Sequence, residues 1–242
     1  MKKIIASAVL SIALITPLAG NAFAAVSFTD LAGSAASAQI EALKEKGIVS
    51  GVTATTFKPA EELTASQGIS LIVKGAQLSL AAISFNKAPT AEGYFKSVSN
   101  DAWYAESFII AKANGLNIPE DIDPSAKLTK EDYVALLVQG MERGANLPML
   151  NLKPVEIADE DAITVTNQGA IQRALHYKLL VLDESGSFNP KETVTREEAA
   201  AILYNAVEYL DNYEEAQQQQ SQETTDNVTE EAPQTNEAEA GQ

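Results

Sequence analysis

Apolar residues recur at helical spacing in three separate stretches of the chain. Each stretch carries apolar side chains at positions i, i+3 and i+4, which share one face of an α-helix. The three sets are Ile69, Ile72 and Val73; Val134, Leu137 and Val138; and Ala200, Leu203 and Tyr204. No single helix can bury such a face by itself, so the pattern predicts three amphipathic helices around a shared core.

Each of these predicted helices begins at a threonine. The threonines are Thr64, Thr129 and Thr195, and they lie 65 and 66 residues apart. A Gln, Asp or Glu stands three positions after each of them. This is the pattern of a capping box, in which the threonine oxygen accepts a hydrogen bond from the N3 amide. A proline five residues before each threonine indicates a turn.

An earlier helix is predicted before each of these proline turns. Its markers are Ile40, Leu43 and Gly47; Phe108, Ala111 and Gly115; and Ile171, Ala174 and Lys178. A glycine just past an apolar stripe suits the left-handed backbone that ends many helices. Because Lys178 takes this place in the third set, we expect that helix to close in another way.

The regular spacing predicts an all-α protein with three helix-loop-helix repeats in one trilobed helical domain. We place the repeats at residues 27–80, 94–144 and 155–210, joined by proline-containing loops. Residues 211–242 are rich in Gln and Glu and poor in large apolar side chains. They cannot bury enough surface to offset the entropy of ordering, so we expect a disordered acidic tail.

Residues 1–24 have the pattern of a signal peptide. Lys2 and Lys3 precede an apolar stretch, and residues 22–24 read Ala-Phe-Ala, with small residues at the two positions that a signal peptidase requires. The stretch is interrupted by Pro17 and is short for a hydrocarbon core of about 30 Å. We therefore expect cleavage rather than a membrane anchor, and a protein exported to the cell wall or cell surface.

The composition argues against most classes of enzyme. The chain has no cysteine, one histidine and a formal net charge of −16. Disulfides, thiolate metal sites and cysteine nucleophiles are excluded, and the lone His176 follows an apolar stripe where a packed or surface residue is expected. We predict no catalytic residue, no metal site and no cofactor. The acidic charge also argues against nucleic acid or an anionic membrane surface as a partner.

The recurring motifs resemble those of the S-layer homology family. Residues 28–30 read Phe-Thr-Asp, residues 47–51 read Gly-Ile-Val-Ser-Gly, and residues 57–59 read Phe-Lys-Pro. Trp103 and the Thr-Arg-Glu of residues 195–197 fit further elements of the same pattern. The resemblance implies three repeats that anchor exported proteins to secondary polysaccharides of the cell wall, often through ketal-linked pyruvate. It also implies that the basic residue after the threonine, the Asp of the first motif and the Trp line grooves between repeats.

The positions that the resemblance assigns to the ligand are scattered over the three repeats. The basic position holds Ala65, Lys130 and Arg196; the Asp position holds Asp30, Ser97 and Asp159; the Trp position holds Ala35, Trp103 and Thr166; and the second turn glycine remains as Gly51. No repeat carries the whole set. The sequence therefore supports at most one complete groove.

Each of these residues also has a structural interpretation. Arg196 is either a carboxylate ligand or a solvent-facing residue paired with a neighbouring glutamate, such as Glu192 or Glu197. Lys130 is a weaker ligand because an ammonium lacks the bidentate fork of arginine. Trp103 is a core residue or a sugar platform, with the core favoured. Asp30 and Asp159 are expected mainly to cap the segment that follows them.

Two hypotheses of function follow from these residues. The first is a non-enzymatic exported module that binds cell-wall secondary polysaccharide, with Arg196, Lys130 and Trp103 as the main glycan ligands. The second is a degenerate S-layer homology protein that keeps the fold and contacts another cell-surface protein without binding glycan.

Overall fold

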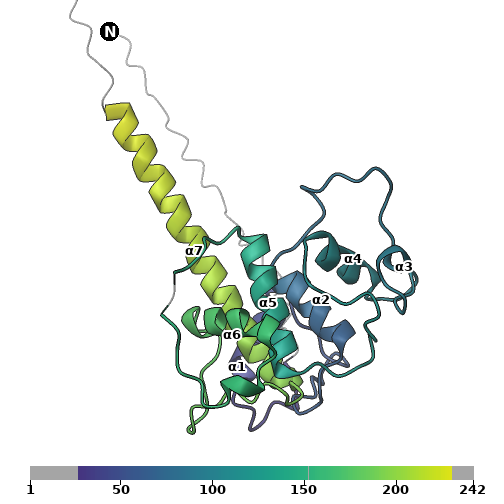
Figure 1. Cartoon of the computed structure of the whole chain (residues 1–242). Helices are drawn as coiled ribbons and strands as arrows, with labels where there is room; N and C mark the ends of the chain where they lie inside the picture. Colours follow the sequence, from purple (N-terminus) through teal and green to yellow (C-terminus); the bar gives the residue numbers. More distant parts are fainter. Residues whose placement is uncertain (1–26, 152, 231–242) are drawn as a thin grey trace, which may run out of the picture.

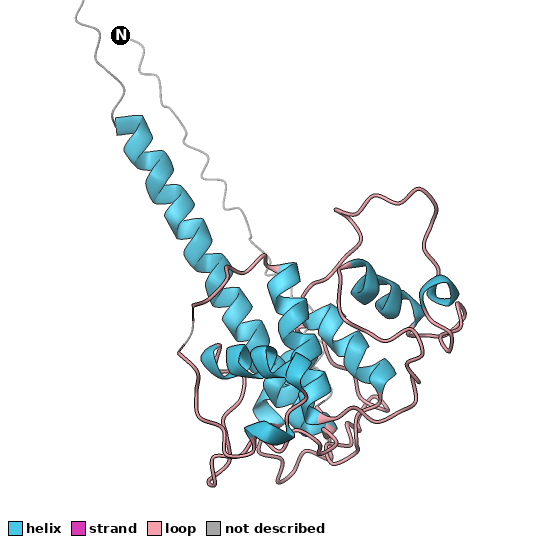
Figure 2. Ribbon diagram, in the orientation of Figure 1, coloured by secondary structure: helices cyan, strands magenta, loops and turns pink. Residues whose placement is uncertain are grey.

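The computed structural model describes residues 27–151 and 153–230, and the predicted signal peptide lies outside them. Within these residues the chain is helical and its only β-pairing is in isolated bridges, as Figures 1 and 2 show, so the predicted all-α fold is confirmed. The helices are α1 (Ser37–Glu45), α2 (Ala65–Gly75), α3 (Ala91–Tyr94), α4 (Ala105–Ala113), α5 (Lys130–Gly144), the 3₁₀ turn η1 (Glu160–Ala162), α6 (Val165–His176) and α7 (Arg196–Glu230).

The helices that begin at the three threonines form the centre of the molecule. Helices α2, α5 and α7 contact one another, and each carries a shorter helix on its outer side. The shorter helix comes from the next repeat in each case: α4 packs on α2, α6 on α5, and α1 on α7 (Figure 1). The first and last repeats are thereby joined, so the three units close into a ring around one core.

Three backbone hydrogen bonds close this ring at its centre. The amide of Leu63 donates to the carbonyl of Val194 at 2.9 Å, that of Val194 to Leu128 at 3.0 Å, and that of Leu128 to Leu63 at 3.0 Å. All three side chains are buried. Each residue directly precedes a capping threonine, so the cycle fixes the starting points of α2, α5 and α7 relative to one another.

All three threonines cap their helices as predicted. The hydroxyl oxygen of Thr64, Thr129 and Thr195 accepts a hydrogen bond from the amide three residues later, at 3.2 to 3.3 Å. The side chains of Gln67 and Glu198 accept in return from the amides of Thr64 and Thr195, which completes the capping box. These bonds satisfy amides that have no partner within the helix.

The prediction that the third early helix closes differently was wrong. Gly47 and Gly115 end α1 and α4 with φ of 72° and 82°, and Lys178 follows α6 with φ of 59°. The amides of residues 48, 116 and 179 all donate back to the carbonyl five residues earlier. Lys178 therefore takes the same left-handed conformation as the glycines, and these helix-ending bonds offset its strain.

Helix α7 extends further than the sequence predicts. Of its side chains up to Gln222, the last buried one is Leu210, yet the helix continues to Glu230 and projects from the body in Figure 1. The side chains from Glu214 to Gln222 are all exposed. Residues 211–230 are thus helical where a disordered tail was predicted, because an uninterrupted helix from a packed body needs no new nucleus. Residues 231–242 lie outside the described part, and disorder there stays a prediction.

Candidate binding grooves between the repeats

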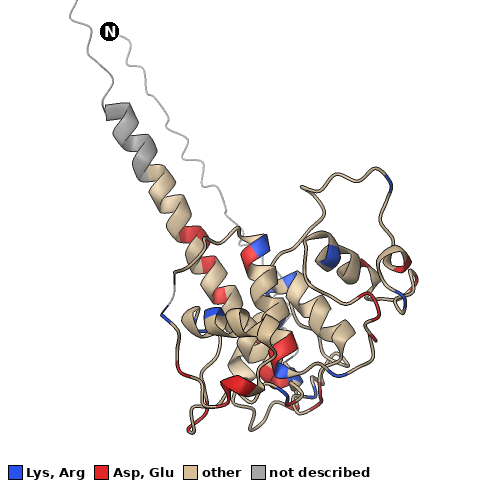
Figure 3. Ribbon diagram, in the orientation of Figure 1, with Lys and Arg blue, Asp and Glu red and all other residues tan. Residues whose placement is uncertain are grey.

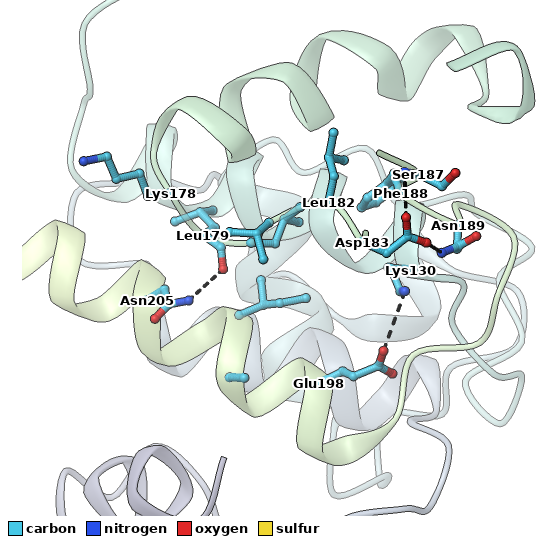
Figure 4. Close-up of a pocket in the computed structure, with 14 residues that line it drawn as sticks. Lys130, Lys178, Leu179, Leu182, Asp183, Ser187, Phe188, Asn189, Glu198 and Asn205 are labelled. Atoms are coloured by element: carbon cyan, nitrogen blue, oxygen red, sulfur yellow. Dashed lines mark hydrogen bonds and ion pairs between the residues drawn. The ribbon is translucent and has the colours of Figure 1, made fainter. Parts of the chain in front are cut away.

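Two cavities lie where the central helices meet the loops of a neighbouring repeat. We name them after the residue at the basic position of the motif. The Lys130 groove, of about 430 Å³ (Figure 4), is lined by Lys130, residues 178–183 and 187–189, and Glu198, Ala201, Ile202 and Asn205 of α7. The Ala65 groove, of about 360 Å³, is lined by Ala65, Asn117, Pro119, Ile122, Asp123, residues 126–128, Asp132, Ala135, Leu136, Gln139, Thr164, Thr166 and Asn167.

The two grooves are the same feature repeated along the chain. Four residues of α5 in the Ala65 groove match four residues of α7 in the Lys130 groove at a spacing of 66 positions. The matched pairs are Asp132 and Glu198, Ala135 and Ala201, Leu136 and Ile202, and Gln139 and Asn205. The repeat therefore predicts where grooves form, although no single-residue pattern in the sequence reveals their volume.

Lys130 is half-enclosed and has two acidic partners. Its side chain is 16% exposed, and its Nζ lies 3.6 Å from carboxylate oxygens of both Glu192 and Glu198. Across the groove, Asn189 donates to Asp183 at 2.9 Å, and hydrogen bonds from Ser185, Ser187 and Asn189 hold the pKa of Asp183 well below its usual range. The Lys130 ammonium thus lies beside Glu198 in a groove whose lining also includes apolar side chains such as Leu179 and Leu182, as Figure 4 shows.

Arg196 is a buried link between the third and first repeats. Its side chain is 8% exposed, its Nε donates to the carbonyl of Phe57 at 2.8 Å, and one terminal nitrogen donates to Ser50 at 3.2 Å. Its guanidinium carbon lies 4.5 Å from the centroid of the Phe57 ring. Burial lowers its pKa, while the nearby charges of Glu61 and Asp30 act in the opposite direction. The predicted solvent-facing pairing is therefore wrong, and the guanidinium is occupied by backbone carbonyls.

Asp30 and Asp159 hold the Phe-x-Pro turns. Asp30 accepts hydrogen bonds from the amides of Phe57 and Lys58 at 2.8 and 2.7 Å, and Asp159 accepts from Phe188 and Asn189 at 2.8 Å each. These bonds, led by the one from Phe57, lower the pKa of Asp30. The expected cap of the following segment was wrong, since each carboxylate reaches about half a repeat along the chain.

The conformation of the turn explains why an aspartate is needed. Lys58 and Asn189 both have positive φ, at 61° and 58°, and the amide of each donates to the aspartate of its repeat. The second repeat has Ser97 at the Asp position, and its turn residue Asp123 does not take positive φ. The aspartate and the left-handed turn occur together.

Gly51 is closely packed, whereas Trp103 is exposed. A Cβ on Gly51 would lie 2.3 Å from the carbonyl oxygen of Thr53 and 2.5 Å from the Phe28 ring, so the absence of a side chain there serves packing. Trp103 is 70% exposed at the start of α4, and its ring lies edge-on to Tyr104 at 5.3 Å. The favoured core position was wrong, and the indole lines neither groove.

The predicted residues fall into two groups. Arg196, Asp30 and Gly51 meet where the third repeat contacts the first, around Phe57 and Ser50. Lys130 and Asp159 share the junction of the second and third repeats, since Phe188 and Asn189 line the Lys130 groove and bond to Asp159. Trp103 stands apart from both groups.

Two glutamates join neighbouring repeats, a role that the sequence analysis assigned to neither of them. Glu131 is 3% exposed and accepts from the amide and hydroxyl of Thr164 at 2.8 Å and from the ammonium of Lys191. Burial opposes its charge, but these bonds hold the pKa of Glu131 below its ordinary value. Glu197 accepts from the Ser34 hydroxyl at 2.7 Å and the Ala36 amide at 3.1 Å. Both glutamates stand two residues after a capping threonine, and this shared position is the sequence signal that could have identified them.

Charged residues are interspersed over the described structure. Figure 3 shows blue and red segments side by side on the helices and loops, without a continuous basic face. Among the described residues no group of His, Cys, Asp and Glu is suited to holding a metal ion, and no helix is both long and apolar enough to cross a membrane.

Comparison with known proteins finds one family motif in two separate parts of the chain. The model of the S-layer homology domain matches residues 27–64 and 160–200. An exoglucanase XynX of Acetivibrio thermocellus is 26% identical over 189 residues, which covers 77% of this chain and 17% of that protein. A surface-layer 125 kDa protein of Lysinibacillus sphaericus is 28% identical over 134 residues, which covers 52% of this chain and 10% of that protein. An endoglucanase of a Bacillus species is 26% identical over 164 residues, or 68% of this chain and 17% of that protein. The chain thus spans less than a fifth of the length of these relatives.

Proposed function

We propose that this chain, which carries S-layer homology domains at residues 27–64 and 160–200, binds a carboxylate-bearing cell-wall polysaccharide through the Lys130 groove. The domain and the surface-layer relative indicate association with the cell surface. The observation that supports glycan binding in this groove is the half-enclosed ammonium of Lys130 beside a cavity of about 430 Å³. That volume is typical of small-ligand pockets, which span about 300–1,000 Å³.

The relatives favour attachment over catalysis as the shared property. An exoglucanase, an endoglucanase and a surface-layer protein have different names and activities, yet they share this segment. The segment makes up at most 17% of each of them. A property common to all three is more consistent with anchoring than with an active site, so we propose a non-enzymatic role.

The chemistry of the Lys130 groove suits a carboxylated sugar. Glu192 and Glu198, the partners of Lys130, have side chains that are 67% and 43% exposed, so each pairing contributes only about 0–1 kcal/mol. A ligand carboxylate can therefore replace one of them at small cost. The amide nitrogens of Asn189 and Asn205 already donate to Asp183 and to the carbonyl of Leu179, and each NH₂ group has a second N–H for a hydroxyl or ring oxygen. Buried Phe188 gives part of the apolar floor.

The test is retention of the protein on purified cell walls. We expect Lys130→Ala to weaken retention at least tenfold, because it removes the cation of the groove. Lys74→Ala is the matched control, since Lys74 is exposed in the last turn of α2 and has no ion pair within the described structure. Removing pyruvate from the walls by mild acid should weaken wild type and the control alike. Full retention by Lys130→Ala would reject the Lys130 groove as the site.

A structural function without glycan is the second candidate. It is favoured by the buried state of Arg196 and by the turn-holding bonds of Asp30 and Asp159, which occupy three of the family's ligand positions internally. Under this alternative, wild-type protein is not retained on native walls. Retention that depends on Lys130 excludes it.

A further inference from the structure

The three repeats meet at three equivalent junctions. At each junction a central helix packs against the outer helix of the next repeat: α2 against α4, α5 against α6, and α7 against α1. The backbone amide after each capping threonine donates to a carbonyl in the turn of that next repeat, at 2.8 Å in all three cases. The backbone therefore joins the three junctions in the same way, and the differences between them lie in their side chains.

Two polar links fasten the α5/α6 junction. Near its beginning, the buried carboxylate of Glu131 accepts hydrogen bonds from the amide and the hydroxyl of Thr164, which directly precedes α6. Near its end, Glu142 of α5 forms an ion pair with Arg173 of α6, and a terminal nitrogen of that arginine donates to it at 3.2 Å. Pulling α6 away from α5 would leave these charged groups without their partners.

The α7/α1 junction has the same two kinds of link. Glu197 accepts from the hydroxyl of Ser34 and from the amide of Ala36, both of which lie just before α1. At the other end, the ammonium of Lys46 donates to Asp211 at 2.7 Å. These two junctions thus share a glutamate near their beginning and an ion pair near their end.

The α2/α4 junction has neither link. Ser66 stands two residues after its capping threonine, where the other junctions have a glutamate. The Ser66 hydroxyl lies 3.0 Å from the hydroxyl of Thr64 in its own repeat. In the part of the chain that the structure describes, the side chains of α2 form hydrogen bonds only within their own repeat, and none of them forms an ion pair.

The outer helix of this junction is held mainly by apolar packing. Helix α4 buries only Ala105, Phe108 and Ala111. Within the described residues, the polar link from α4 and its cap to the first repeat is one hydrogen bond, from the Asn114 side chain to the Ser79 carbonyl at 3.0 Å, and it is exposed. Water replaces an exposed hydrogen bond at little net cost. Separating α4 from α2 therefore leaves no buried charge without a partner.

Helices α3 and α4 form one small lobe, which we call the α3–α4 lobe (residues 91–114). Within it, the ring of Phe95 lies 5.3 Å from the ring of Phe108. Residues 76–90 contain no helix and join the lobe to α2, and Figure 1 shows the lobe on the side of the body away from α7. Ser97 replaces the aspartate that holds the turn in the first and third repeats, and its hydroxyl has no hydrogen bond within the described structure. The lobe is internally packed but weakly tied to its surroundings.

From these differences we infer that the α3–α4 lobe is a hinged unit, which detaches from α2 while the rest of the ring stays folded. A unit opens locally when the contacts that hold it are fewer or weaker than those that hold the remainder of the protein. Here they are apolar contacts and one exposed hydrogen bond, whereas α1 and α6 are also held by charged links. The lobe gives the ring a second state, in which the apolar face of α2 is exposed. This inference does not depend on glycan binding.

Thiol labelling measures the opening, because the chain has no cysteine of its own. Ala111 on α4 and Ala174 on α6 occupy the same position of the repeat, and both are 0% exposed. A cysteine at either position reacts with iodoacetamide only when its junction opens. We expect Ala111→Cys to be labelled at least tenfold faster than Ala174→Cys under native conditions. Low urea should change the rate for Ala111→Cys only slightly, because opening the lobe exposes much less surface than global unfolding does.

One further substitution tests whether the charged links cause the difference. Added to Ala174→Cys, Glu131→Gln weakens the α5/α6 junction and should speed labelling at least fivefold. Added to Ala111→Cys, it should leave the labelling rate unchanged. If a cysteine variant does not fold, hydrogen exchange of the wild-type protein followed by mass spectrometry makes the same comparison, and the amides of α4 should exchange at least tenfold faster than those of α6.

Three results would overturn the inference. The first is equal labelling of the two cysteine variants, or equal exchange of α4 and α6. The second is labelling of Ala111→Cys with the full urea dependence of global unfolding, which would mean that the lobe does not open separately. The third is an unchanged labelling rate when Glu131→Gln is added to Ala174→Cys.

Discussion

Replacing Arg196 by alanine removes a side chain that bonds the third repeat to two backbone carbonyls of the first repeat. Arg196 directly follows the capping Thr195, and its carbonyl partners belong to Phe57 and Ser50 on the facing loop. The substitution leaves both carbonyls inside the junction without their donors. It also removes the guanidinium that stacks on the Phe57 ring.

The structure sets the expected size of this effect. Hydrogen bonds from a charged donor contribute about 1.5–3 kcal/mol each, and a cation over an aromatic ring adds about 1 kcal/mol. Desolvation of the guanidinium, which lowers its pKa, offsets part of this gain. Breaking a buried charged contact typically costs about 3–5 kcal/mol. We expect Arg196→Ala to lower the free energy of unfolding by about 3 kcal/mol.

Urea denaturation followed by far-ultraviolet circular dichroism measures this loss. With a slope of about 1–3 kcal/mol per molar urea, a loss of about 3 kcal/mol should lower the midpoint by about 1–3 M. Arg196→Lys keeps the charge but not the planar fork, and it should lose about half as much. Lys130→Ala is the matched control at the same motif position, and it should lose less than about 1 kcal/mol because its partners are exposed.

Two results would refute the structural role of Arg196. One is a loss below about 1 kcal/mol, which would mean that the two carbonyl bonds contribute no net stability. The other is an unchanged urea midpoint together with abolished retention on cell walls. That second result would return Arg196 to the ligand role that the family resemblance implies.

Three other changes have expected outcomes. Glu131→Gln should destabilise the protein at pH 7 by about 1–3 kcal/mol. Folding lowers the pKa of Glu131, so its carboxylate stabilises the protein fully above the ordinary glutamate pKa near 4.3. This stabilisation is lost as the pH falls through the lowered pKa, so the urea midpoints of variant and wild type should converge in acid. Gly51→Ala should cost about 2–4 kcal/mol in the same assay, since its Cβ would overlap the Thr53 carbonyl; a loss under 1 kcal/mol would contradict the packing. Trp103→Ala should change stability by less than about 0.5 kcal/mol, and wild-type tryptophan emission should already lie at the solvent-exposed wavelength before unfolding; a red shift on unfolding would contradict its exposure.

Local patterns predicted the helices well because their causes are local. The capping threonines act on amides three residues away, and the apolar stripes follow from one period of the helix. The prediction for Lys178 was wrong because the hydrogen bonds that end the helix outweigh the preference of this conformation for glycine. Those bonds impose the same left-handed conformation on lysine as on glycine.

Side-chain roles were harder to predict because they depend on which repeat supplies the neighbour. The turn that Asp30 holds lies 27 residues away, and the carbonyls that Arg196 bonds lie 139 and 146 residues away. Trp103 was expected in the core on residue type alone, yet 70% of it is exposed. The partners of Arg196 lie in another repeat, and the turn held by Asp30, although in the same repeat, lies too far along the chain for a local pattern to reveal it.

By itself, the sequence determined that the protein is helical, that its central helices begin at Thr64, Thr129 and Thr195, and that its motifs resemble those of S-layer homology repeats. These properties follow from residue type and spacing along one chain segment. Only the tertiary structure decided that the repeats exchange their outer helices in a ring, with each motif completed by its neighbour. For that reason the same position is a buried link at Arg196, a half-enclosed cation at Lys130 and the wall of an open groove at Ala65.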